Sequence, residues 1–357
     1  MQNKARFAAG LLAVLFALCA LSAAGFAATP KNALGALAVS PDGSTLAAAG
    51  DNQVLYLVDP ATLEVRERIH LGTSPLEIWY SADGSTLALL TTDDELLFLD
   101  TAGWAIKGEA QDVFAVAHAA AADVLVALGR PKRAQDGSFT TPLRVLPLSG
   151  AAPILEVAVA GEIASIASKP DASAFVALTK QIKDESEVKQ DPPSDLKGFD
   201  KEVFKLQHDQ QASEVILLDA AGVETGRQAT WFSQGSGLFG IYGPSGVHFL
   251  GYSNRNATFA PDGTLVTVFA GPSSFNYALG TDAGQGQVAV GSLRDGAIVA
   301  LADGAALEFA IDQGRGWPEY FKGYAFAPDG SLWGGTTAYR LVHIGADGAV
   351  LAIKPIF

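Results

Sequence analysis

The sequence predicts an all-β fold, a seven-bladed β-propeller whose blades are four-stranded antiparallel sheets. Three observations support this fold class. A short strand–turn–strand segment recurs along the chain, its first two copies place Asp42 and Asp83 41 residues apart, and no long segment has the apolar spacing of a helix. Seven units of about 47 residues each fit the length that follows residue 27, and six blades is the alternative.

The first repeated element is a hairpin with an Asp-Gly turn. The segment VSPDGSTLAAAG at 39–50 recurs as YSADGSTLALLT at 80–91, and weaker copies begin at residues 168, 259 and 326. Glycine adopts positive φ without strain, and an aspartate bonds to the backbone two residues further on, so the pair favours a tight turn. The repeat therefore predicts the first and second strands of each blade.

The second repeated element completes the blade. A strand ending in Asp, a tight turn and another strand occupy 55–69, and the same pattern returns at 96–110 and 215–229. A divergent unit lies between the second and fourth copies. Its expected strands, and those of the last three blades, are 112–118, 123–129, 143–148, 154–160, 238–243, 247–252, 256–260, 265–270, 275–281, 287–292, 297–302, 306–311, 321–327, 331–336, 339–345 and 349–353. We expect residues 28–357 to form one propeller domain.

Residues 41–84 resemble the YVTN family of β-propeller repeats. They contain the Pro-Asp-Gly turn, a strand ending in a hydrophobic-Asp pair, and a Gly-x-x-Pro entry from Gly72 to Pro75. The resemblance is close in blades one and two, partial in four and seven, and poor elsewhere. The segment YAFAPDGSLWGG also resembles lyase-type and NHL-type propellers, whereas the Gly-His and Trp-Asp pairs of WD40 repeats are missing. The resemblance implies a WD40-like propeller fold and export, but no single activity.

The N-terminus has the pattern of a signal peptide. Lys4 and Arg6 precede an uncharged apolar segment, which ends in the small residues Ser22, Ala24, Gly25, Ala27 and Ala28. We expect residues 1–27 to be removed, which predicts a periplasmic or secreted protein with no membrane span after cleavage. An uncleaved anchor is the alternative. Leu18 before Cys19 does not fit a lipoprotein signal.

Composition and motifs exclude several classes of protein. The formal net charge of −14 argues against a nucleic-acid partner. The single cysteine excludes a disulfide framework and an iron–sulfur site. The G-x-G-x-x-G match at 235–240 has no following helix, and the chain has no nucleophile elbow, metalloprotease motif, P-loop or haem-attachment motif. We therefore predict no catalytic residue and no cofactor.

Two long insertions are expected on one face of the propeller. The loops between second and third strands and the crossovers between blades leave from the same end of every blade, here called the top face. The insertions are residues 129–142 in blade three and 180–211 in blade four. The spacing of Phe199, Val203 and Leu206 predicts a helix near 198–208, which either caps its blade or docks on a partner.

Basic and aromatic residues make the top face a candidate binding surface. Arg130, Lys132 and Arg133 either pair with acids of the neighbouring insertion or receive an anionic ligand. Aromatic side chains in the crossovers either rim the central pocket or wedge between blades. The predicted binding residues are Arg130, Lys132, Arg133, Phe199, Trp231, Trp317 and Tyr320.

Three carboxylates are candidate metal ligands. Glu77, Asp112 and Glu162 lie at the starts of the expected inner strands of blades two, three and four. Side chains at the start of an inner strand are expected to face the central channel from the top. Carboxylate oxygens bind Ca²⁺, and lactonase-type propellers hold a cation in this way, but three acids can also gather by chance.

These observations lead to two functional hypotheses. The first is an exported, non-enzymatic module that binds a protein partner or a cell-envelope component through its top face. The alternative is a metal-assisted, lactonase-like hydrolase or lyase.

Overall fold

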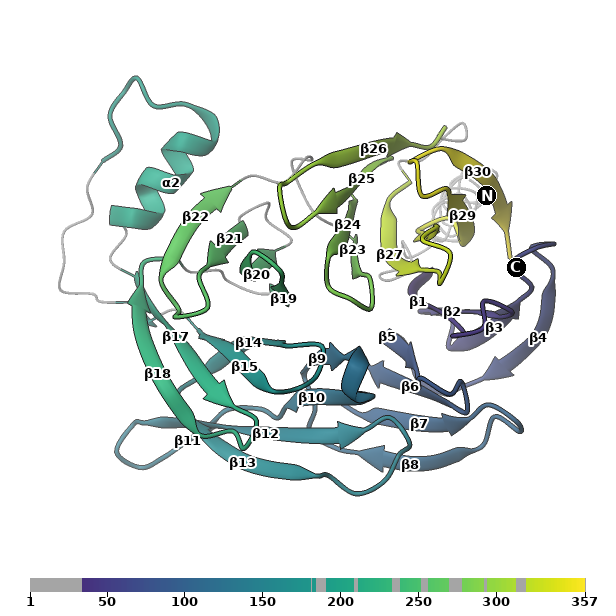
Figure 1. Ribbon diagram of the computed structural model, residues 1–357, viewed down its shortest axis with the longest axis horizontal. Coiled ribbons are helices and arrows are strands. Elements are labelled where there is room, and N and C mark those ends of the chain that lie inside the picture. The colour runs from purple at the N-terminus through teal and green to yellow at the C-terminus, as the bar shows by residue number, and fades with distance from the viewer. Residues whose placement is uncertain are drawn as a thin grey trace, which may run out of the picture. The chain divides into compact units, whose positions relative to one another are not determined.

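Seven antiparallel blades surround a central channel (Figure 1). The computed structural model describes residues 34–180, 182–183, 191–208, 211–232, 238–251, 256–269, 278–291, 294–312 and 319–356. The predicted signal peptide lies outside these residues. No helix in the described part of the chain is both long and apolar enough to cross a membrane. The predicted fold class and the predicted number of blades are confirmed.

The first three blades are formed by strands in chain order, from the channel outward. Blade one is β1 (Leu34–Val39), β2 (Leu46–Gly50), β3 (Val54–Val58) and β4 (Val65–His70), and blade two is β5 (Pro75–Tyr80), β6 (Thr86–Thr91), β7 (Leu96–Asp100) and β8 (Ile106–Ala110). Blade three is β9 (Ala115–Ala119), β10 (Val124–Leu128), β12 (Phe139–Pro147) and β13 (Leu155–Ala160); η1 (Ala120–Ala122) connects β9 to β10, and the short β11 (Lys132–Arg133) pairs with β12.

The remaining blades repeat this order. Blade four is β14 (Ile163–Ser168), β15 (Ala174–Thr179), β17 (Gln211–Asp219) and β18 (Glu224–Thr230); its insertion contains the short β16 (Ile182–Lys183), which pairs with β17, and α2 (Gly198–His208). Blade five is β19 (Leu238–Gly243), β20 (Gly246–Gly251), β21 (Asn256–Phe259) and β22 (Leu265–Phe269), and blade six is β23 (Ala278–Thr281), β24 (Gln287–Gly291), β25 (Asp295–Ala300) and β26 (Ala306–Ala310). Blade seven is β27 (Phe321–Phe326), β28 (Leu332–Thr336), β29 (Arg340–Ile344) and β30 (Val350–Pro355).

The observed strands follow the expected ones closely. Strand β19 has the predicted bounds, whereas β25 begins two residues before the predicted 297. Strand β9 starts at Ala115 and not at the predicted residue 112, because Asp112 has a φ of 58° and so leaves the extended conformation.

The Asp-Gly turns are built as the sequence predicts. Asp42 Oδ1 accepts hydrogen bonds from the Ser40 hydroxyl at 2.6 Å and from the Ser44 amide at 3.0 Å. Asp83 does the same for Ser81 and Ser85. These bonds stabilise the charged carboxylate and lower the pKa of both aspartates to about 2. The turns lie at the end of the blades opposite the top face, here called the bottom face.

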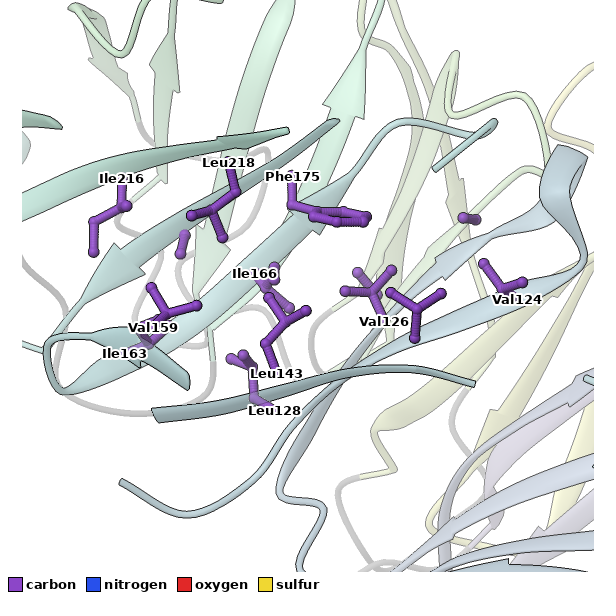
Figure 2. Close-up of a cluster of buried hydrophobic side chains, with 14 residues drawn as sticks. Val124, Val126, Leu128, Leu143, Val159, Ile163, Ile166, Phe175, Ile216 and Leu218 are labelled. Carbon is purple, nitrogen blue, oxygen red and sulfur yellow. The ribbon is translucent and has the colours of Figure 1, made fainter. Parts of the chain in front are cut away.

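The core lies between the blades. The described buried side chains form seven hydrophobic clusters, one at each contact between neighbouring blades. Figure 2 shows the cluster between blades three and four, where Val124, Val126 and Leu128 of β10 face blade four. The alternate residues Leu125 and Ala127 belong to the cluster with blade two. Because successive side chains of a strand point to opposite faces of its sheet, each strand contributes side chains to the clusters on both sides of its blade.

Candidate functional site

The blade-three insertion is a hairpin that extends its sheet on the top face. Lys132 and Arg133 of β11 pair with Thr140 and Phe139 at the start of β12. The Arg133 guanidinium lies 5.8 Å from the centroid of the Phe139 ring. Both basic side chains are exposed and form no ion pair within the described residues.

Arg130, at the base of this hairpin, is held by acids near the junction with blade two. Its Nε donates to Asp94 Oδ2 at 2.6 Å, and its backbone amide donates to Asp112 Oδ1 at 3.2 Å. Arg130 therefore forms its ion pair with the blade-two turn, and not with any described residue of the blade-four insertion. All three predicted cations are exposed, but only the charge of Arg130 is paired with a described acid, so Lys132 and Arg133 are the two that remain unpaired among the described residues.

The blade-four insertion contains the predicted helix at the predicted residues. Helix α2 spans Gly198–His208. Its Phe204 and His208 rings are stacked, with their centroids 3.9 Å apart. Phe199 and Val203 are half-buried on one side, whereas Lys201 and Lys205 are exposed on the other. The seven clusters of the described core include no residue of α2, and Figure 1 draws α2 outside the ring of strands. The described apolar side chains of α2 therefore lie outside the clusters of the propeller core.

The predicted rim aromatics differ in their surroundings. Trp231 and Tyr320 are half-buried at the entries to blades five and seven, and Trp317 lies outside the described residues. Phe232 next to Trp231 is fully buried in the cluster between blades four and five. At this entry one aromatic side chain wedges between blades while its neighbour stays partly accessible.

The three predicted metal ligands have separate environments. Asp112 accepts a backbone hydrogen bond from Arg130, and Glu162 forms an ion pair with Lys180 at 2.9 Å. Neither lines the channel, whereas Glu77 does. Among the described residues, no three His, Cys, Asp or Glu side chains lie close enough to hold a metal ion. The structure therefore does not bring the three carboxylates into one site.

The central channel is a cavity of about 1220 Å³ lined by all seven inner strands. Glu77 and Trp79 line it from blade two, His118 from blade three and Lys322 from blade seven. Burial raises the pKa of Glu77 to about 7 and lowers that of His118 to about 4. Trp79, His118 and Lys322 were not predicted, because the apolar pattern of an inner strand does not show which of its side chains face the channel.

A glutamine closes part of the bottom end of this channel. Gln285, in the turn between β23 and β24, donates from Nε2 to the carbonyl oxygens of His118 at 3.1 Å and Ser168 at 3.0 Å. Its Oε1 accepts from the Tyr242 amide at 2.7 Å. One side chain of blade six thus bridges the inner strands of blades three, four and five. No pattern in the sequence identifies Gln285 as such a bridge.

An ion pair stabilises the segment that enters blade seven. It was not predicted from the sequence. Arg340 donates from Nε to Glu319 Oε1 at 2.8 Å, its Nη2 contacts Glu319 Oε2, and the Thr336 hydroxyl bonds to the same carboxylate. Glu319 is only 6% exposed. No motif in the sequence marks this pair, because the two residues are separated by a complete hairpin.

Comparison with known proteins found no matching family model and no curated protein with a similar sequence. Function is therefore inferred from the fold and the two insertions.

Proposed function

We propose that this protein is an exported, non-enzymatic β-propeller of YVTN-type blades that binds a protein partner through its top face. The main support is that two neighbouring blades carry long insertions between their second and third strands, in β11–β12 and around α2. Loops of this length in a compact fold are commonly functional. The basic and apolar segment at the N-terminus supports export to the periplasm or the exterior.

The two insertions offer complementary chemistry to a partner. The blade-three hairpin presents the charges of Lys132 and Arg133, and α2 presents Phe199 and Val203. Apolar anchors supply most of the affinity of protein interfaces, whereas rim charges govern association rate and specificity. The chemistry of the surface selects a partner segment that combines acidic and apolar residues.

Replacement of residues 184–208 by a short Gly-Ser linker tests this function. We expect the melting temperature to stay close to that of the intact protein, because the described core clusters contain no residue of this segment. Affinity capture from an envelope extract, read by quantitative mass spectrometry, is expected to lose its specific partner.

A matched pair of variants makes the test specific to the apolar side of α2. F199S/V203S is expected to lose the partner, and K201S/K205S, on the other side of the same helix, is expected to retain most of it. Equal recovery of the same partner by the intact protein and by the linker variant would defeat the proposal.

A further inference from the structure

Two side chains of β5 point away from blade one. Ile78 belongs to the cluster between blades one and two, so Glu77 and Trp79 on either side of it face blade three. Their cross-strand neighbours on β6 agree with this direction. Glu77 is opposite Leu90, which belongs with Trp79 to the cluster between blades two and three.

Strand β9 supplies the opposite wall. Val116 and His118 pair with Ala127 and Leu125 of β10, which also belong to the cluster between blades two and three. The centroids of the Trp79 and His118 rings lie 6.5 Å apart, and the angle between the ring planes is 53°. Glu77, Trp79 and His118 therefore border one recess between β5 and β9, and all three line the channel cavity.

Glu77 differs from the other carboxylates that line the cavity. Asp123 accepts a hydrogen bond from the Ala82 amide at 2.7 Å, and Asp282 accepts one from the Gln287 amide at 2.6 Å. The half-buried Glu77 carboxylate forms no hydrogen bond or ion pair with the described residues. Burial of a carboxylate without a partner is unfavourable, and a bound cation removes that penalty.

We propose that the recess between β5 and β9 binds a small organic cation, an ammonium group attached to an apolar body. The Glu77 carboxylate neutralises the ammonium, and the Trp79 ring contacts it through its negative face. Leu90, Phe114 and Val116 line the cavity beside them and suit the apolar part of the ligand.

The remaining charges of the cavity are compatible with such a ligand. The low pKa of His118, about 4, keeps its ring neutral near pH 7, so it does not repel a cation. Lys322 comes from blade seven, and blade one separates its strand from β5. The site is independent of the top-face insertions, so the two proposals can fail separately.

Calorimetric titration of the full mature chain with 2-phenylethylammonium at pH 8 tests the site. Glu77→Gln keeps the size of the side chain and removes its charge, and we expect at least a tenfold loss of affinity, with a melting temperature no lower than that of the intact protein. Trp79→Leu removes the aromatic wall and is expected to weaken binding several-fold. Glu162→Gln, at an acid outside the cavity, is the matched control and is expected to bind normally.

Two further titrations distinguish the ligand class. Binding is expected to weaken between pH 8 and pH 5.5, because Glu77, with a pKa of about 7, becomes protonated, and this pH dependence is expected to vanish in Glu77→Gln. The uncharged 2-phenylethanol is expected to bind at least tenfold more weakly. Unchanged affinity in Glu77→Gln, equal binding of the alcohol, or binding of Ca²⁺ alone would each overturn the proposal.

Discussion

Gly323 of β27 lies so close to the carbonyl oxygen of Gly35 in β1 that a side-chain Cβ at residue 323 would overlap with that oxygen. This contact joins the last blade to the first. No strand is shared between them, since blade seven is formed only by C-terminal strands and blade one only by N-terminal strands. Besides this close backbone contact, an apolar cluster that includes Trp333 and Ile356 closes the ring. The Tyr339 hydroxyl also accepts a hydrogen bond from the backbone amide of Asn52 at 3.0 Å.

Gly323→Ala is therefore expected to destabilise the propeller. The added methyl group forces β27 and β1 apart, and overpacking of this kind costs about 1–3 kcal/mol. Urea unfolding measures the change. Gly103→Ala is the control, because a Cβ at Gly103 meets no atom within 4 Å, and equal stability of the two variants would contradict this account of ring closure.

Removal of the Arg340 charge is expected to destabilise blade seven strongly. Arg340→Met keeps much of the side-chain volume but removes the positive charge that neutralises the buried Glu319 carboxylate. Loss of one member of a buried pair costs about 3–5 kcal/mol, whereas loss of an exposed pair costs about 1 kcal/mol or less. Arg66→Met, at the more exposed pair with Asp59, is the control. Chemical unfolding of both variants checks the difference, and similar losses would show that burial of Glu319 does not matter.

The bottom-face turns are expected to make stability fall in acid. The pKa values of Asp42 and Asp83 are about 2 in the folded protein, below the ordinary value of 3.8. A carboxyl with a lowered pKa stabilises the fold at pH values above 3.8, and this contribution is lost as the pH falls from 3.8 to about 2.

The double variant D42N/D83N is expected to lose less stability than the intact protein between pH 4 and pH 2, since it has two fewer carboxyls to protonate. Melting temperatures measured from pH 2 to pH 6 test this expectation. Parallel curves for the two proteins would show that the turn aspartates do not contribute to the acid response.

The sequence predicts what depends on local pattern. Two-residue alternation and Asp-Gly turns predicted the seven blades, and the spacing of Phe199 and Val203 predicted α2. The positions of both insertions followed from strand order alone, because each blade must present its second-to-third loop at the same end. Loop topology was therefore predictable even where the resemblance to known repeats was poor.

Contacts between distant residues could not be predicted in this way. Arg130 binds Asp94, 36 residues away, and Gln285 bonds to His118, 167 residues away. The absence of a partner for Glu77 among the described residues also depends on which residues approach it from blade three. Such relationships depend on how two blades meet, which no pattern within a single blade encodes.

Gln285→Ala is expected to destabilise the bottom ends of three blades together. The substitution leaves the carbonyls of His118 and Ser168 and the amide of Tyr242 without their bonds to Gln285, and an unsatisfied buried polar group costs about 1–3 kcal/mol. Hydrogen exchange is expected to speed up at the Tyr242 amide, with Gln135→Ala, at an exposed hairpin residue, as the control. Because Gln285 comes from blade six, faster exchange in blade five would show that this turn stabilises the neighbouring blade. Unchanged exchange would show that the Gln285 hydrogen bonds contribute nothing.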